Sequence, residues 1–395
     1  MKSILVVTEI FYPESGLIND FVEELQRRGY KVDILTQHPS YPAGIVFPGY
    51  KNDYYSTEQW NTITIHRFKL VEGYKTNIYR KILNYWTFVR IGKKIARKIG
   101  DQYDHILVYQ TGPLTLALPA VEIKKRFGKK LTIWTFDIWP DTVYAYGFPK
   151  IFPITVFLNS IIGKVYRNAD NILVSSKGFI ESIQNYVPGK KIVYAPNWMI
   201  AEDQVPSNLK LNSEKFNFTF TGNISISQNL ENVLKGWKLA SLDNAILNIV
   251  GDGSQIKLLQ ALIKKESIEN VVLHGRYPSN QIGHILEQSN TLILSLIPNY
   301  GIDKTEPFKI QSYLQSGKPI FGVISGSGKE IILENQLGVC SNPVDIQLIA
   351  NGLKESVSFA EKSTSDVALS SRKLINTRFN RQDIIDRVLS VLNMV

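Results

Sequence analysis

A short segment in the second half of the chain combines a carboxylate, a lysine and the start of a helix. It runs from Glu306 to Ile320, and its pattern predicts a tight turn, a short helix that stops at Gly317, and a strand. Glu306 and Lys309 stand near the first turn, where unpaired backbone N–H groups and the positive end of the helix dipole favour anions. We therefore expect a ligand that carries phosphate.

Asp137 is a second residue whose position suggests chemistry. It follows an apolar run over residues 131–136 and opens the stretch Asp-Ile-Trp-Pro-Asp. A carboxylate at the carboxyl end of a strand, beside aromatic side chains, can have a shifted pKa and act in acid–base chemistry. The alternative is that it caps the next helix, a common role for Asp. We favour a functional role for Asp137 and a capping role for Asp141.

Glycine-containing loops follow several of the predicted strands. Gly16 lies between the first strand and the first helix, where glycine lets backbone approach a ligand, although a plain turn is an equal alternative. Gly222, Asn223 and Gly253 close strands in the second half, where backbone N–H groups can meet phosphate or ribose. Arg276 follows a later strand, either as a phosphate ligand or as a solvated loop residue.

The elements that must position these residues alternate regularly. Strand-like apolar runs alternate with helical patterns almost throughout, which predicts parallel sheets covered by helices. The pattern restarts after a polar bridge over residues 205–213, so we expect two doubly wound, Rossmann-like α/β domains, 1–204 and 205–395. The last helix, about 381–395, can pack back on the first domain. A central cleft between the domains is the expected ligand site.

Length and composition exclude several classes of protein. The chain has 395 residues, of which 44% are hydrophobic, enough for two globular cores and unlike a disordered protein. One cysteine excludes an internal disulfide, and no apolar run suits a signal peptide or a membrane span, so we expect a cytoplasmic protein. The five histidines are scattered, and no metal site is predicted.

Much of the net charge of +10 belongs to a helical pattern over residues 78–99. Basic and aromatic residues interleave there: Arg80, Lys81, Trp86, Arg90 and Lys94. Such a helix can lie on an anionic membrane surface, or it can pack on the core with a solvated basic face. We favour membrane docking. Nucleic-acid binding is not expected, because no nucleic-acid module is present.

Taken in order, these motifs resemble those of the family 4 retaining glycosyltransferases, which have the GT-B fold. The resemblance covers nearly the whole chain, and residues 137–141 look like the Asp-Leu-Trp-Pro-Glu motif of a subgroup that builds bacterial O-antigen, capsule and colanic acid, including N-acetylfucosamine-type transferases. The matching motifs are Tyr12-Pro13…Gly16, residues 28–32, residues 169–176, residues 195–198, Gly222-Asn223…Gln228, residues 250–253 and Lys309…Tyr313…Gly317-Lys318-Pro319.

The resemblance implies a hexosyl- or N-acetylhexosaminyltransferase that acts with retention of configuration. Its second domain would bind a nucleotide-sugar donor, with a UDP-sugar favoured, and its first domain a polyprenyl-diphosphate-linked saccharide acceptor. Neither a cofactor nor a metal is expected. The protein would lie at the inner face of the cytoplasmic membrane, bound to its anionic surface.

The chain departs from the family in its donor motif, a glutamate pair spaced E-x7-E. Lys304 and Ser312 occupy those two places, so Glu306 would be a displaced substitute. The predicted catalytic residues are Asp137 and Glu306; the predicted donor-binding residues are Gly16, Gly222, Asn223, Gly253, Arg276, Lys309 and Ser312; and the predicted membrane or acceptor residues are Arg80, Lys81, Trp86, Arg90 and Lys94. Two alternatives are a sugar-nucleotide epimerase or hydrolase on the same fold, and a non-catalytic binding protein at the membrane.

Overall fold

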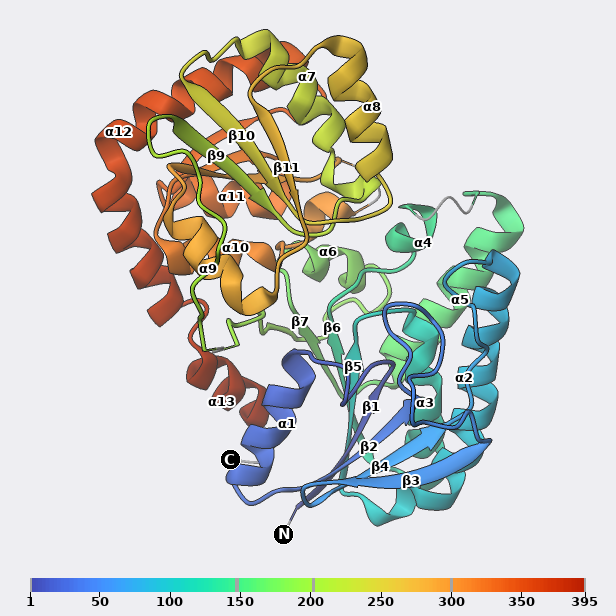
Figure 1. The fold of residues 1–395 in the computed structure, drawn as a ribbon. Helices are drawn as coiled ribbons and strands as arrows, with labels where there is room; N and C mark the ends of the chain where they lie inside the picture. The colour runs from blue at the N-terminus through green and yellow to red at the C-terminus, as the bar shows by residue number, and fades with distance from the viewer. Residues whose placement is uncertain (1, 146–148, 201–202, 299–300, 394–395) are drawn as a thin grey trace. The chain divides into compact units, whose positions relative to one another are not determined.

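The computed structural model describes residues 2–145, 149–200, 203–298 and 301–393 (Figure 1). The chain forms two compact α/β units. Unit 1 comprises Met1–Pro196 and Gln382–Val395, and unit 2 comprises Asn197–Arg381.

Within its described residues, unit 1 contains an eight-stranded sheet of order β3-β4-β2-β1-β5-β6-β7-β8, parallel except for the β3–β4 pair. Its strands are β1 (Ser3–Thr8), β2 (Lys31–Gln37), β3 (Tyr55–Trp60), β4 (Ile63–Phe68), β5 (His105–Gln110), β6 (Lys130–Thr135), β7 (Asn171–Val174) and β8 (Ile192–Tyr194). The whole of β1 and of β5 is buried, as expected for strands covered on both faces. The antiparallel β3–β4 hairpin at the sheet edge was not predicted from the sequence.

The helices of unit 1 follow the strands in the doubly wound pattern. They are α1 (Leu17–Arg27), α2 (Ile78–Ile99), α3 (Leu118–Phe127), α4 (Asp141–Ala145), α5 (Phe152–Asn168), α6 (Phe179–Gln184) and α13 (Arg381–Val391). Asn77 caps α2, because its side chain accepts hydrogen bonds from the N–H groups of Tyr79 and Arg80.

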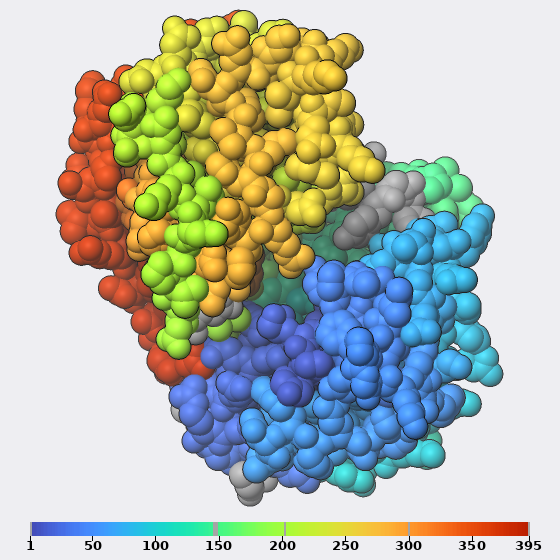
Figure 2. Space-filling model, viewed as in Figure 1, coloured from blue at the N-terminus to red at the C-terminus, as the bar shows by residue number. Residues whose placement is uncertain are grey.

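Unit 2 contains a parallel sheet of order β11-β10-β9-β12-β13-β14, six-stranded among the described residues. Its strands are β9 (Phe216–Thr221), β10 (Ala245–Val250), β11 (Val271–Gly275), β12 (Thr291–Ser295), β13 (Ile320–Val323) and β14 (Gly338–Ser341), and its helices are α7 (Leu230–Ala240), α8 (Ile256–Glu266), α9 (Ser279–Glu287), α10 (Lys309–Ser316), α11 (Gly326–Glu334) and α12 (Ile346–Asn376). The long α12 packs against α7 and β14 and lies along one side of unit 2, red in Figure 2.

Both sheets reverse their strand order beside the first strand of the unit. The reversal falls between β1 and β5 in unit 1 and between β9 and β12 in unit 2. The carboxyl ends of strands at such a switch point are the usual ligand positions in open α/β sheets. The predicted α/β class with two doubly wound units is thus confirmed, and the residues after β1, β5, β9 and β12 occupy these candidate ligand positions.

The structure divides the chain eight residues before the predicted boundary at 204/205. The intervening segment is assigned to unit 2, and its first residue contacts α10 of that unit: the Asn197 carbonyl accepts a hydrogen bond from Gln311 Nε2 at 2.6 Å. The C-terminal helix belongs to unit 1. Arg387 on α13 donates to the Tyr194 carbonyl at 2.9 Å, and Arg28 on α1 forms an ion pair with Asp386. Residues 394–395 of the predicted last helix lie outside the described residues.

Candidate functional sites

Lys309 is the central residue of the candidate site in unit 2. It begins α10, and its ammonium group reaches the carboxyl end of β9. Nζ donates to Gln228 Oε1 at 2.5 Å and lies 4.0 Å from the centroid of the Phe220 ring. A Cβ atom at Gly222 would lie 3.2 Å from Nζ, so the lysine sits directly over this glycine.

The ammonium group of Lys309 has no acidic partner among the residues that the structure describes. Burial lowers the pKa of Lys309 to about 7, and no neighbouring carboxylate counteracts that shift. A buried cation is costly unless an anion pairs with it. The geometry therefore fits a lysine whose partner is a bound anion, and anion binding at this position stays a prediction.

The two glycine loops beside Lys309 are packed against each other. Gly222 and Gly251 adopt φ values of +136° and +147°, which disfavour other residues. A Cβ atom at Gly251 would lie 1.9 Å from the Gly222 carbonyl oxygen, and one at Gly253 would lie 2.3 Å from the Ile224 carbonyl oxygen. These glycines are required for the close approach of the loops after β9 and β10.

Two of the predicted phosphate-binding N–H groups are engaged within the protein. Gly222 N–H donates to the Val250 carbonyl at 3.0 Å, and Gly253 N–H donates to Asp252 Oδ1 at 2.7 Å. Both glycines thus serve loop packing, and their role in donor binding stays a prediction. Asn223 is exposed beside them, and its role in donor binding stays a prediction.

The remaining predicted residues of unit 2 lie in three different settings. Ser312 Oγ donates to the Lys309 carbonyl at 2.8 Å within α10, and Arg276 is exposed after β11. Glu306 is buried and forms an ion pair with Arg378 at 2.8 Å. The carboxylate of Glu306 thus has a cation of its own, and the pair ties the start of α10 to the end of α12.

In unit 1, Asp137 lies just beyond β6, at the carboxyl edge of the sheet. Thr142 Oγ1 donates to Asp137 Oδ1 at 2.5 Å. Burial raises the pKa of Asp137 to about 7; the Thr142 hydrogen bond and the charge of Lys81 act downward, and the charge of Glu9 acts upward. A carboxyl group that titrates near neutral pH is suited to accept or share a proton with a substrate.

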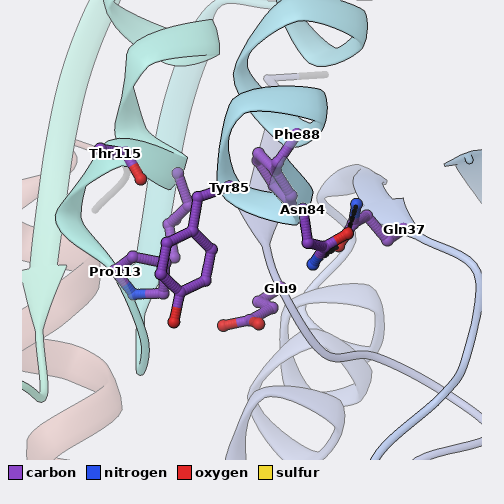
Figure 3. Close-up of a pocket in the computed structure, with 8 residues that line it drawn as sticks. Glu9, Gln37, Asn84, Tyr85, Phe88, Pro113 and Thr115 are labelled. Atoms are coloured by element: carbon purple, nitrogen blue, oxygen red, sulfur yellow. Dashed lines mark hydrogen bonds between the residues drawn. The ribbon is translucent and has the colours of Figure 1, made fainter. Parts of the chain in front are cut away.

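Glu9 is a carboxylate of this edge that the sequence reasoning did not single out. It follows β1 directly and lines a small pocket with Gln37, Asn84, Tyr85, Phe88, Pro113, Thr115 and Leu116 (Figure 3). Burial raises the pKa of Glu9, and the charges of Lys75 and Lys81 oppose the shift. Its place directly after the first strand, comparable to that of Asp137 after β6, was the available signal.

Lys81 differs from the other basic residues predicted to face a membrane. It is partly buried on α2, burial lowers its pKa, and the charges of Glu9 and Asp137 partly offset that effect. Lys81 therefore belongs to the polar cluster at the carboxyl edge of the sheet and not to the exposed basic face of α2, and its role toward a membrane or an acceptor stays a prediction.

The other four residues predicted on α2 are exposed. Arg80, Trp86, Arg90 and Lys94 all reach solvent, with Trp86 54% exposed and the Arg90 guanidinium 4.8 Å from the centroid of its ring. This helix also exposes Ile78, Tyr79, Ile82 and Leu83. Exposed apolar and basic residues therefore share its first three turns.

Gly16 is the N-cap of α1, with φ −177° and ψ 166°. This is extended backbone that any residue adopts, and a Cβ atom there would meet only Ile18 Cγ2, at 4.0 Å. Glycine is thus not required by the backbone at this position, and its role toward a ligand stays a prediction. Among the described residues, no group of three His, Cys, Asp or Glu side chains could hold a metal ion.

Comparison with known proteins identifies the class. Residues 202–365 match the family model described as "Glycosyl transferases group 1". A putative colanic acid biosynthesis glycosyl transferase, WcaI of Escherichia coli (strain K12), is 19% identical over 385 residues, covering 93% of this chain and 94% of WcaI. A probable glycosyltransferase, WbjE of Pseudomonas aeruginosa, is 21% identical over 263 residues, covering 63% of this chain and 65% of WbjE.

Solved structures share the fold over the whole chain. Sucrose-phosphate synthase from Thermosynechococcus elongatus has a TM-score of 0.75 at 14% identity, covering 100% of this chain and 98% of its own. HepE from Anabaena, in complex with UDP, has a TM-score of 0.67 at 12% identity, covering 100% of both chains. The fold is that of the GT-B glycosyltransferases. Together these similarities support a glycosyltransferase, in which residues 202–365 match the group 1 glycosyl transferase model.

Proposed function

We propose that the protein transfers a hexose or N-acetylhexosamine from a nucleotide sugar, with UDP-sugars favoured, to a lipid-linked saccharide, with retention of configuration. The reaction would contribute to a bacterial surface polysaccharide such as O-antigen or capsule. The curated relatives support the setting, since one is named for colanic acid biosynthesis, and the UDP complex of HepE supports the donor class.

The observation that carries the donor proposal is the ammonium group of Lys309. It lies over Gly222 at the switch point of unit 2, without an acidic partner among the described residues. A nucleoside diphosphate supplies the missing anion, and the diphosphate leaving group gains negative charge as the sugar departs. Lys309 is placed to stabilise that charge, so we expect transfer without a metal ion.

Thermal stabilisation measures this binding directly. We expect UDP to raise Tm in the presence of EDTA, and GDP, CMP, dTDP and ADP to raise it less. The UDP effect should disappear in Lys309→Ala and persist in the control Lys264→Ala, which removes an exposed lysine of the same unit. An equal shift in Lys309→Ala would remove the basis of the donor proposal.

The acceptor proposal includes a membrane surface on unit 1. Figure 1 shows α2 and α5 in unit 1, and the charge of Lys164 on α5 acts on Lys93 of α2, so the helices are neighbours. The first turns of α5 expose Phe152, Val156 and Phe157, as α2 exposes Trp86 among basic residues. None of the described helices is long and apolar enough to cross a membrane. Exposed apolar side chains beside cations fit the headgroup region of an anionic bilayer.

Vesicle co-sedimentation tests this surface. We expect the protein to bind phosphatidylglycerol vesicles and to bind phosphatidylcholine vesicles more weakly. The double variant Trp86→Ala/Phe157→Ala should bind phosphatidylglycerol vesicles about tenfold more weakly, because both substitutions remove apolar area that the bilayer would bury. The control Leu369→Ala removes a comparably exposed side chain of unit 2 and should bind normally. Equal sedimentation of all variants would contradict the proposed surface.

A further inference from the structure

The backbone around Glu9 is fixed at the switch point of unit 1. Glu9 follows β1, and its carbonyl oxygen accepts a hydrogen bond from Thr36 Oγ1 at 3.1 Å. On the other side of the switch, the loop after β5 carries Gly112, where a Cβ atom would lie 2.1 Å from Glu9 Oε2. The glycine therefore leaves the space that the Glu9 carboxyl group occupies.

Gln110, at the end of β5, joins this loop to the neighbouring one. Its Nε2 donates to the carbonyl oxygens of Gly112 at 2.7 Å and Asp137 at 2.9 Å, which fixes the loops after β5 and β6 relative to each other. Its Oε1 is buried and has no hydrogen-bond partner within the described chain. A buried acceptor without a donor is costly, and a ligand hydroxyl at this edge would satisfy it.

Two glutamates of the same loop differ in what they contact. Glu14 accepts hydrogen bonds from the N–H groups of Ser40 at 2.9 Å and Tyr41 at 2.6 Å, which is a structural role. The Glu9 carboxyl group forms no hydrogen bond or ion pair with described residues, and it faces the pocket, as does the ring of Tyr85 (Figure 3). The two amide side chains beside it, Gln37 and Asn84, bind each other at 3.1 Å. These two amides therefore satisfy each other, whereas the Glu9 carboxyl group has no partner among the described residues.

We propose that Glu9 is an acceptor-binding residue, whose carboxyl group accepts a hydrogen bond from a hydroxyl of the acceptor sugar at the carboxyl edge of β1 and β5. This inference rests on the proposed function and deepens it. Its ligand is a hydroxyl-bearing glycoside rather than the nucleotide, because the edge presents Glu9 and Asp137 instead of an unpaired cation. Glu9 then helps to decide which sugar configuration is accepted.

The test compares Glu9→Gln and Glu9→Ala with the unaltered protein. Octyl glycosides of glucose, galactose and N-acetylglucosamine serve as acceptor probes, and release of UDP from the matching UDP-sugar is the readout. We expect the KM for the productive glycoside to rise about ten- to hundredfold in Glu9→Ala and less in Glu9→Gln, the loss of one hydrogen bond to a charged group. The KM for donor should stay unchanged, because the proposed nucleotide-binding residue, Lys309, belongs to unit 2. Glu23→Gln on the exposed face of α1 is the control.

The outcomes separate this inference from the proposed function. An unchanged acceptor KM in Glu9→Ala, with active unaltered protein, would overturn the role of Glu9 and leave the transferase proposal standing. A raised donor KM would also overturn it, since Glu9 would then act on the nucleotide. Failure of the unaltered protein to release UDP from any UDP-sugar, with or without glycoside, would overturn both. Equal Tm values for the variants would exclude misfolding as the cause of a change.

Discussion

The two units share one architecture and differ in the charge at their switch points. In unit 1, the carboxyl ends of β1 and β6 carry Glu9 and Asp137, two carboxyl groups whose pKa values burial raises. In unit 2, the carboxyl end of β9 meets Lys309, a cation whose pKa burial lowers. The same sheet topology therefore presents acceptors of hydrogen bonds in one unit and an unpaired positive charge in the other.

The two charges suit the two proposed substrates, a sugar acceptor in unit 1 and a nucleotide sugar in unit 2. A sugar hydroxyl donates hydrogen bonds and pairs well with carboxylates, whereas a diphosphate needs a cation. Lys81 adds a further contrast, since it lies among carboxyl groups that partly offset the lowering of its pKa, and Lys309 has no such neighbour among the described residues. Single substitutions can change the charge in one unit without changing the other, so the difference between the two units can be tested.

The largest expected effect is the loss of kcat when Asp137, at the carboxyl end of β6, is changed. Asp137→Asn keeps the shape of the side chain and removes its ability to carry charge or accept a proton, so kcat should fall about 10²- to 10⁴-fold. Calorimetric affinity for UDP should not change, because the proposed nucleotide site lies in unit 2. Steady-state release of UDP gives kcat. If kcat of Asp137→Asn lies within twofold of the value for the unaltered protein, Asp137 takes no part in the chemical step.

The second effect concerns Glu306, predicted as catalytic and found in an ion pair. Glu306→Gln removes the carboxylate that forms the ion pair with Arg378, so the free energy of unfolding should fall by about 3 kcal/mol. Urea denaturation measures the loss. The double variant Glu306→Gln/Arg378→Met should recover most of the lost stability. If that stable double variant transfers sugar normally, the role of Glu306 is structural; if it is stable and inactive, the catalytic prediction holds.

A smaller effect of opposite sign is expected at Lys309. Lys309→Met removes a buried charge, so the nucleotide-free protein should gain about 1–2 kcal/mol of stability while losing UDP binding. Because the pKa of Lys309 is about 7 in the folded protein and 10.5 ordinarily, the gain should be full below pH 7 and shrink as pH rises toward 10.5. Thermal denaturation at pH 6 and 9 measures it. If Lys309→Met is less stable than the unaltered protein at both pH values, the ammonium group of Lys309 has a counterion in the nucleotide-free protein, contrary to this prediction.

Much of this arrangement could be predicted from the sequence, because it depends on local patterns. The βαβ alternation predicted the two parallel sheets, and the position of Lys309 at the start of a helix predicted an anionic ligand. The tertiary partners could not be predicted: that Arg378 pairs with Glu306, or that Gly253 serves loop packing, depends on segments distant in sequence. Lys81 was misplaced because helical periodicity does not show which side chain turns toward the edge of the sheet.

The affinity for an intact nucleotide sugar, measured as a function of pH, shows directly whether Lys309 supplies the positive charge for the diphosphate. The diphosphate of UDP-glucose does not titrate between pH 6 and 9, so any change reports the protein. If Lys309 supplies the charge, calorimetry should show affinity falling above pH 7, by up to about tenfold per pH unit, and Lys309→Arg should bind with little pH dependence, because arginine remains charged. Affinity that is constant from pH 6 to 9 in the unaltered protein, and unchanged in Lys309→Ala, would contradict the account.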